Sequence, residues 1–443
     1  MTSTSPPSPP PTTEGGQTRR LSDLIKRPVV DNGGETLGRL SDVIVRLGGS
    51  DYPQVKGIVV AIGGGREVFV PLNQVVGFDG EVIKLTTAKL DLRQFERREG
   101  EVLLNADVLG HRLIDVPNAR LVRAADLQLH RDDGEWVLSG VDTRPRARRL
   151  FGLLGPEQSR DEPGSRTSFR DWHDFEWLIG HARSELHRGP FARVRRLKPA
   201  QIADLLEEAS KNEETEILDR VHADPELEAD VFEELDEDLA TRLLGARTDE
   251  EIAAVLSRMQ ADDAADTVAE LPQPRRQPVL DLLPPGQRAK VLTLLGFNST
   301  SAGGLMGVDY VAVPSRATVA DALAAIRAAT TLQPEALTTV HAVDADGALS
   351  GVARLVTLVQ SDPGRPLLDV SDTDPVRVGA DTDIMDVAVL MTDYNLITIP
   401  VVDDERRMLG VITVDDVLEV TLPDDWRRRE AAEPPDARHG DAR

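Results

Sequence analysis

Three aspartates at a helical spacing are the residues of this sequence best suited to chemistry. Asp262, Asp263 and Asp266 stand close together, and the four-residue spacing places Asp262 and Asp266 on one face of a helix, with Asp263 beside them. Carboxylates so placed repel one another unless a cation lies between them, and Mg²⁺ takes a few carboxylates plus waters. The alternative is helix capping by Asp262 or Asp263, which needs no metal. Because Asp266 lies too far into the helix for capping, we favour a metal site.

The motifs of the common enzyme classes are missing from the sequence. It has no cysteine, which excludes disulfides, thiolate zinc sites and a cysteine nucleophile. It has no Gly-Lys-Ser/Thr, no Gly-x-Ser-x-Gly and no His-Glu-x-x-His, and Gly63-Gly-Gly-Arg66 is typical of a hairpin turn. We therefore expect a protein that is not an enzyme.

The aspartates belong to an acidic stretch with a short helical period. Between 199 and 298, apolar pairs such as Leu205/Leu206 and Val255/Leu256 recur about every dozen residues, separated by cap and turn residues. Helices this short must stack into a superhelix to bury their apolar faces. The stretch has 24 Asp and Glu against nine Lys and Arg, in a chain with 76 acidic and 51 basic residues. Such a surface repels nucleic acid and attracts cations.

The N-terminal third has the pattern of short β-strands around glycine turns. Strand signals at 57–62, 67–72 and 81–87, with a further pair around Gly33-Gly34, predict a small barrel. A similar unit follows from 105 to 136. Both units resemble PRC-barrel domains, a resemblance that implies an adaptor role. Residues 144–198 then form a basic connector broken by prolines, with one amphipathic helix over 171–181 that is expected to pack against the second barrel or the acidic array.

After the array, the order strand, helix, strand, turn, strand, helix occurs twice, with matching glycines Gly351 and Gly410. The repeat resembles a tandem pair of CBS domains, strongly in the second unit and more weakly in the first. CBS pairs bind adenine nucleotides through a Thr/Ser-x-x-Asp signature, which Thr413 and Asp416 match. The first unit lacks it at 353–356, so the resemblance implies at most one site for ATP or AMP.

The order acidic array, Ala302-Gly-Gly-Leu-Met306, then two CBS units resembles the cytosolic half of the MgtE magnesium channel family. The resemblance covers roughly 199–422 and implies Mg²⁺ binding between array and CBS pair, at Asp230, Asp262 and Asp266 on the array and Asp383 and Asp416 on the second CBS unit. The sequence departs from the family pattern at Met385 and Asn395, where acids are expected. The five membrane spans of the family are missing, and the uncharged run 291–308 is too polar to be one.

We predict a multidomain α+β protein with N-terminal small PRC-like β-barrels, an α-superhelical array and a C-terminal tandem CBS α/β pair. The expected domains are a disordered lead (1–18), a PRC-barrel-like domain (19–98), a second PRC-like unit (99–143), the basic linker with its amphipathic helix (144–198), the acidic MgtE-like helical domain (199–298), CBS 1 (299–366), CBS 2 (367–422) and a disordered tail (423–443).

The function we predict is that of a soluble, cytoplasmic, magnesium-responsive regulatory protein, peripheral to the membrane at most. One alternative is an accessory subunit of a magnesium transporter whose pore is another chain, and another is an adenine-nucleotide sensor. The expected partners are a membrane transporter or other protein, bound through the PRC-like barrels, and a second copy bound through the CBS pair. No nucleic acid and no membrane insertion are expected. Glycines at 302–304 and prolines at 283–286 are expected to let array and CBS pair move.

Overall fold

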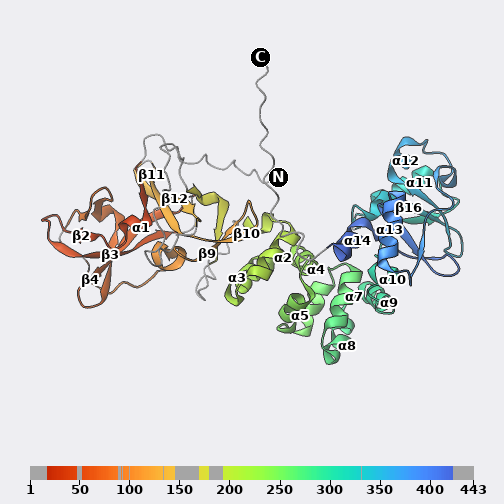
Figure 1. Cartoon of the computed structure of the whole chain (residues 1–443), viewed down its shortest axis with the longest axis horizontal. Coiled ribbons are helices and arrows are strands. Elements are labelled where there is room, and N and C mark those ends of the chain that lie inside the picture. The colour runs from red at the N-terminus through yellow and green to blue at the C-terminus, as the bar shows by residue number, and fades with distance from the viewer. Residues whose placement is uncertain are drawn as a thin grey trace, which may run out of the picture. The chain divides into compact units, whose positions relative to one another are not determined.

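The structure is a computed structural model that describes residues 17–46, 52–87, 91, 93–98, 100–132, 134–144, 169–178, 193–330 and 332–422. The chain divides into two compact units, Met1–Asp236 and Glu237–Arg443 (Figure 1). The first holds the strand-rich region and the first three helices of the array, and the second holds the remaining array helices and the CBS-like units. The predicted disordered lead and tail, and most of the basic linker, lie outside the described residues.

The strand-rich region is built around an eleven-stranded sheet in the order β1-β11-β12-β4-β3-β2-β7-β6, with β13, β5 and β8 pairing beside this path, and a smaller sheet β10-β9-β14. Its strands are β1 (Thr18–Arg20), β2 (Pro28–Val30), β3 (Thr36–Arg46), β4 (Gln54–Ile62), β5 (Arg66–Pro71), β6 (Val75–Gly77), β7 (Ile83–Leu85), β8 (Glu101–Leu103), β9 (Arg112–Asp115), β10 (Arg120–Arg123), β11 (Asp126–Asp132), β12 (Glu135–Asp142), β13 (Arg170–Asp171) and β14 (Phe175–Trp177). Its short helices are α1 (Leu21–Leu24), η1 (Leu72–Gln74), η2 (Leu104–Val108) and η3 (Trp172–Asp174).

The second half of this region repeats the first, from β8 to β14 as from β1 to β6. Lys26 and Gly110 have positive φ angles of 71° and 82° at matching positions after the first short helix. The Lys26 N–H donates to the Leu40 carbonyl at 2.9 Å, and the Gly110 N–H donates to Ala124 at 2.7 Å. A 3-10 helix then precedes the last strand of each copy, η1 before β6 and η3 before β14. We refer to residues 18–77 as repeat 1 and to residues 101–177 as repeat 2.

Each repeat places its first strand and helix on the other repeat. Strand β1 pairs with β11, and β8 pairs with β3. The Asp42 carboxylate in β3 accepts hydrogen bonds from the backbone N–H groups of Asn105 and Ala106 in η2, at 2.7 and 2.9 Å. In the same way, Asp126 in β11 accepts from the Ser22 N–H in α1 at 3.1 Å. Because a helix leaves its first N–H groups unpaired, these two buried carboxylates satisfy donors across the two repeats.

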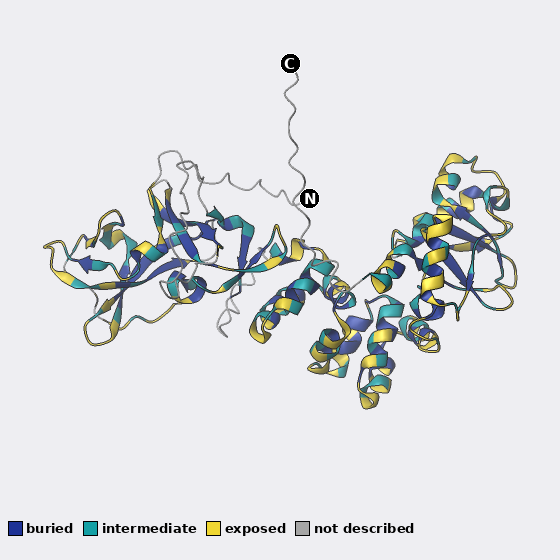
Figure 2. Ribbon diagram, viewed as in Figure 1, coloured by how far each residue is buried: buried dark blue, intermediate teal, exposed yellow. Residues whose placement is uncertain are grey.

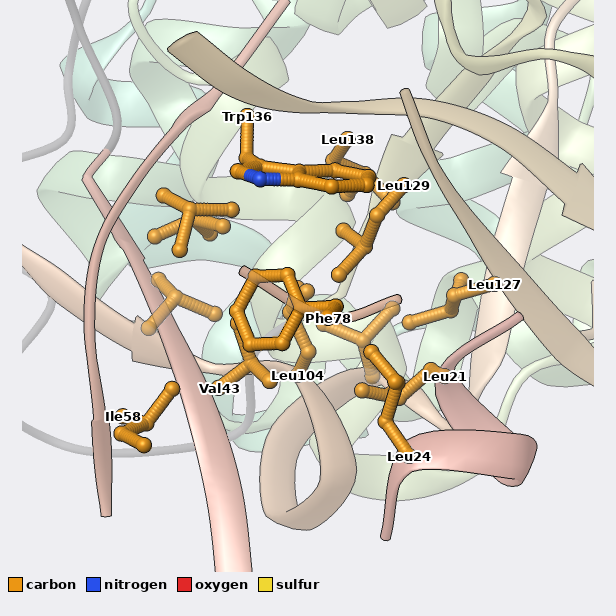
Figure 3. Packing of buried hydrophobic residues seen from close by; sticks show 14 of the residues in the cluster. Leu21, Leu24, Val43, Ile58, Phe78, Leu104, Leu127, Leu129, Trp136 and Leu138 are labelled. Carbon is orange, nitrogen blue, oxygen red and sulfur yellow. The ribbon is translucent and has the colours of Figure 1, made fainter. Parts of the chain in front are cut away.

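One hydrophobic core serves both repeats (Figure 3). Leu21, Val43 and Phe78 come from the first part of the region, and Leu104 and Trp136 from the second. The rings of Phe78 and Trp136 meet edge to face with their centroids 5.2 Å apart. The two PRC-like units are therefore interlocked through one sheet and one core.

The predicted amphipathic helix over 171–181 is wrong. Its described part forms β13, η3 and β14. The Asp171 carboxylate accepts from the His173 N–H at 2.9 Å and closes a short turn, while β13 pairs with β12 and β14 with β9. Sheet pairing has overridden the helical periodicity, and the segment completes repeat 2. Trp172 and Phe175 lie in the barrel core, so the segment belongs to the second barrel and does not pack against it as a separate helix.

The array consists of short helices, as predicted. They are α2 (Pro199–Glu208), α3 (Lys211–Val221) and α4 (Pro225–Glu233) in the first unit, and α5 (Glu237–Gly245), α6 (Asp249–Leu256), α7 (Ala261–Glu270), α8 (Gln273–Leu282) and α9 (Pro285–Leu294) in the second. Several begin at a proline or at a Ser/Thr capping box, such as Thr248 with Glu251. Helices pack against the next but one, α5 on α7 and α7 on α9. The helices bury one face and expose the other (Figure 2).

The two CBS-like units have the same topology, which confirms the internal repeat. The first contains β15 (Ala312–Pro314), α11 (Val319–Ala328), β16 (Thr339–Val343), β17 (Leu349–Arg354) and α12 (Leu355–Gln360), and the second contains β18 (Val378–Gly379), α13 (Ile384–Tyr394), β19 (Thr398–Val402), β20 (Met408–Thr413) and α14 (Val414–Thr421). In each, a parallel strand pair is followed by an antiparallel one. The Thr339 and Thr398 hydroxyls join the two units at 2.9 Å.

The segment between array and CBS units is tightly packed at Gly303 and Gly304, two of the glycines that are expected from the sequence to allow movement. Helix α10 (Ala302–Leu305) packs on β18 and β20. A Cβ on Gly303 would stand 2.7 Å from the Phe297 ring, and one on Gly304 would stand 2.2 Å from the Asn298 carbonyl oxygen. Gly307 and Val411 exchange two backbone hydrogen bonds of 2.9 Å. The glycines allow close approach of backbone, and the segment is fixed to the second CBS-like unit.

Candidate functional site

Asp262 lies in the first turn of α7, where its carboxylate accepts hydrogen bonds from its own N–H and from that of Asp263. The helix-capping alternative is thus part of its role. Capping lowers the pKa of a carboxylate. Yet burial, followed by the negative charge of Asp416, raises the pKa of Asp262 to about 7. The cap is therefore outweighed by desolvation and by a second carboxylate, which is the electrostatic situation that a cation relieves.

Asp416 lies in the first turn of α14 and forms a capping box with Thr413. Its Oδ2 accepts from the Thr413 N–H at 2.9 Å and from the Thr413 hydroxyl at 2.6 Å. Burial, then the charges of Asp415 and Glu335, raise the pKa of Asp416 to about 6. The charge of Asp416 raises the pKa of Asp262, but Asp262 does not raise the pKa of Asp416 in return. The reason is that Asp262 is protonated first as the pH falls, so it is already neutral when Asp416 takes up its proton.

Asp266 belongs to a neighbouring carboxylate cluster on α5 and α7. Desolvation, followed by the charges of Glu237 and Glu270, raises the pKa of Asp266 to about 6. Because the residue as a whole is exposed, the two charges are the more secure cause. Glu237 and Glu270 also share a hydrogen bond, and the charge of Glu270 and that bond raise the pKa of Glu237. Asp266 contributes to the pKa of Asp262 as well, so the two aspartates are electrostatically linked as the sequence predicts.

The remaining predicted ligands are placed differently. Asp230 is exposed on α4 in the first unit, where desolvation and the charges of Glu226, Asp224 and Glu234 raise its pKa. Asp263 lies beside Asp262 in the first turn of α7. Asp383 is exposed at the N-cap of α13 and accepts from the Met385 N–H at 2.8 Å.

The two departures from the family pattern have their own structural places. Asn395 ends α13 in the left-handed conformation, with φ 50° and ψ 51°, a position that asparagine tolerates better than most residues. Met385 is 57% exposed near the start of α13.

The donor set fits Mg²⁺ only as a small set of carboxylates. Within the described ranges, no three Asp, Glu or His side chains are gathered so as to hold a metal ion. Asp262 and Asp416 form a pair, and Asp416 has Oδ1 left over from its capping box. Since Mg²⁺ keeps several waters and is commonly bound through one or two protein carboxylates, this pair suits it better than an all-protein cage would.

Two acids at the site escaped the sequence reading. Glu270 is four residues from Asp266 on α7, so helical spacing could have pointed to it. Glu237 lies on α5, and the packing of α5 on α7 brings it to the cluster. Nothing in the local sequence around Glu237 indicates this contact.

Three family models match the chain: the MgtE intracellular N domain over 197–300, the CBS domain over 368–422 and the PRC-barrel domain over 16–92. The chain therefore contains an MgtE intracellular N domain, a CBS domain and a PRC-barrel domain. The predicted order of PRC-like barrels, MgtE-like array and CBS units is confirmed by these matches. No helix in the described part of the chain is both long and apolar enough to cross a membrane.

Two curated relatives are MgtE magnesium transporters. The one from Thermus thermophilus is 41% identical over 144 residues, which is 32% of this chain and 32% of the relative. The one from Bacillus subtilis is 23% identical over 226 residues, 51% of this chain and 49% of the relative. The matched stretches span less than half the length of these relatives. Among solved structures, the cytosolic domain of the Mg²⁺ channel MgtE in complex with ATP is 31% identical with a TM-score of 0.48, covering 51% of this chain and 92% of that one.

Proposed function

We propose that this chain is a magnesium-responsive regulatory protein in which Asp262 on α7 and Asp416 on α14 bind Mg²⁺. The observation that carries the proposal is the burial of Asp262 next to a second carboxylate: burial, and after it the charge of Asp416, raises the pKa of Asp262 to about 7. Two ionised carboxylates held together here destabilise the fold, and a divalent cation turns the repulsion into a bridge. The curated relatives over this stretch are magnesium transporters, which favours Mg²⁺ over other divalent ions.

The ion would act by favouring one arrangement of α7 and α14. Without it, a proton on Asp262 or a separation of the two carboxylates relieves the repulsion. With it, the two helices are held together, and the size of the response is set by how much better the ion binds that arrangement. Asp263 and Asp266 remain candidate ligands beside the pair. Asp230 and Asp383 remain candidates by family resemblance alone. We propose no catalytic role for any of these residues.

Calorimetric titration of the full chain with Mg²⁺, Ca²⁺ and Mn²⁺ tests this function. Wild type should take up Mg²⁺ with release of protons near pH 7, because the ion displaces the proton of Asp262. Asp262→Asn and Asp416→Asn should each weaken binding at least tenfold, since each removes a charged ligand. Asp393→Asn, which removes an exposed acid on α13, should change nothing. Equal Mg²⁺ binding by wild type and both site variants would refute the proposal.

A second candidate function is adenine-nucleotide sensing, which rests on Thr413 and Asp416. They stand together at the end of β20 and the start of α14, where a ribose hydroxyl could replace the Thr413 hydroxyl on Asp416. In the first CBS-like unit Arg354 is at the matching N-cap and makes no side-chain cap, so one nucleotide per chain is expected. ATP or AMP should then raise the melting temperature of wild type, and Asp416→Ala should abolish the rise while Thr357→Ala leaves it.

The partner proposals concern a second copy and a transporter. Val356 and Val359 on α12 are both 66% exposed, and Met385 and Val389 on α13 are 57% and 56% exposed. Burying these apolar side chains against a second copy would stabilise a homodimer, which light scattering would detect. Because the curated relatives are transporters, the second partner proposal is that the chain is an accessory subunit, cytoplasmic and peripheral to the membrane, whose pore is another chain. Co-purification with a membrane protein, lost on removal of residues 1–192, would support it.

A further inference from the structure

The second repeat of the strand-rich region is bound to the first helices of the array through paired charges. Arg112 in β9 donates from Nη1 to the Glu208 carbonyl at 3.1 Å and to Glu213 Oε2 at 3.2 Å. It therefore meets the C-terminal end of α2 and the first turn of α3 at once. The C-terminal end of α2 favours a cation because the last carbonyls of a helix carry partial negative charge, and at the start of α3 the attraction comes from the Glu213 carboxylate.

A second pair of opposite polarity lies on the same helix. Arg220 on α3 donates to Glu176 Oε1 and to the Trp177 carbonyl, both at 2.9 Å, and both acceptors belong to β14. Glu176 is 8% exposed, and its other oxygen accepts the Val194 N–H at 2.9 Å from the short helix η4 (Arg193–Arg196). Burial raises the pKa of Glu176 against the attraction of Arg220. Leaving this carboxylate without its arginine would be costly, since a buried charge without a partner loses its hydration uncompensated.

Repeat 1 is an internal comparison for these contacts. At the positions that match Arg112 and Glu176 it has Pro28 in β2 and Val76 in β6. Neither residue carries a charge, and Val76 is 62% exposed. The charges that contact α2 and α3 are thus peculiar to repeat 2, while the order of elements is shared by the two repeats. The last strands differ in their partners, since β14 pairs with β9 and β6 pairs with β7. The charged residues at these positions are therefore needed for the contact with α2 and α3 and not for the fold of a repeat.

We propose that Arg112, Glu176 and Arg220 form a clasp that fixes the paired PRC-like repeats to helices α2–α4 as one rigid body. The barrels are then no freely tethered adaptor, because Glu176 also holds η4, the short helix just before α2. Any change in the position of α2–α4 carries the barrels with it. Movement of the barrels in response to magnesium would depend on the function proposed above, whereas the clasp itself does not.

Distance measurement between two spin labels on the full chain tests the clasp. The chain has no cysteine of its own, so Lys56→Cys on β4 and Asn212→Cys on α3, both exposed, give one pair of labels. Wild type should show a narrow distance distribution that Mg²⁺ does not broaden. Arg112→Met with Arg220→Met should broaden it several-fold. Arg39→Met, which removes an exposed arginine from repeat 1, should leave it narrow.

Further outcomes separate the clasp from folding and from the proposed function. Arg220→Lys keeps the charge but gives up the two-pronged contact, so it should broaden the distribution less than Arg220→Met if folding is intact in both. A broad wild-type distribution, or one unchanged in the double variant, would overturn the clasp. A narrow distribution in a chain that binds no Mg²⁺ by calorimetry would refute the sensing function and leave the clasp standing.

Discussion

Replacing Asp262 by asparagine should stabilise the second unit in the absence of metal. Asparagine keeps a side-chain oxygen for the N–H groups at the start of α7 and removes the charge that faces Asp416. The pKa of Asp262 rises from 3.8 to about 7 on folding, and at 1.36 kcal/mol per pH unit this corresponds to roughly 4 kcal/mol against the ionised form. Because the residue is only partly buried, solvent screening leaves about half of that, ~2 kcal/mol.

The sign of the pH dependence follows from a pKa that is raised in the folded state. The folded protein holds the proton of Asp262 more tightly than the unfolded chain, so its contribution is full below the unfolded value of 3.8 and is lost as the pH rises through about 7. The advantage of Asp262→Asn over wild type should therefore be largest at pH 8 and shrink steadily as the pH falls from 7 toward 4. For a unit of this size, ~2 kcal/mol corresponds to a rise in melting temperature of about 4 to 8 °C.

Scanning calorimetry in chelator at pH 8, 7, 6 and 5 measures this directly. Asp393→Asn is the matched control, since it removes an exposed acid from the same unit, and it should follow wild type at every pH. Adding Mg²⁺ at pH 8 should raise the melting temperature of wild type more than that of Asp262→Asn, and so close the gap. If Asp262→Asn melts with wild type at pH 8, or if its advantage does not change with pH, then the repulsion inferred between Asp262 and Asp416 is wrong.

Three further predictions concern His341, the buried acceptors Asp42 and Asp126, and the pH dependence of metal binding. Burial lowers the pKa of His341, whose Nδ1 contacts the Val311 carbonyl, to about 4. As the pH falls, the unfolded chain is protonated first, so the free energy of unfolding of the second unit should fall by up to about 3 kcal/mol between pH 6.5 and 4. His341→Gln should reduce this loss in thermal melts at acid pH. Asp42→Ala should lower the melting temperature of the first unit because it removes both acceptor oxygens from the N–H groups at the start of η2, a loss of about 1 to 3 kcal/mol. Asp126→Ala should act similarly through α1, and hydrogen exchange should show the loss of protection in the helix of the opposite repeat each time. Affinity for Mg²⁺ should rise with pH through about 7, because metal and proton compete for Asp262. Calorimetry at pH 6 and 8 measures this, and equal affinities at the two pH values would contradict the prediction.

The sequence alone determined the elements whose signals are local. Hydrophobic periodicity with capping residues fixed the short helices of the array, such as α6 behind the Thr248 cap, because a helix satisfies its own backbone and needs only a nearby face to bury. Glycine turns and apolar runs fixed the hairpin of β4 and β5. The internal repeat of the CBS-like units and their order after the array were also legible, since each depends on spacing along the chain.

Tertiary structure decided what depends on residues far apart in the chain. Periodicity predicts a helix that includes residues 171–177. In the structure, hydrogen bonding to strands β12 and β9 makes this segment extended. The glycines of α10 indicated freedom, yet a close approach to Phe297 and Asn298 explains them.

The pairing of Asp262 with Asp416, and of Arg220 with Glu176, was decided in the same way. The sequence gives the sign of each charge but not its partner. The partner is determined by the packing of elements that lie far apart in the chain, and no local sequence pattern indicates this packing. For the same reason the sequence does not predict that the first strand of each repeat pairs with the other repeat. Strand pairing depends on which sheet edges are available in the folded protein, and not on the order of strands along the chain.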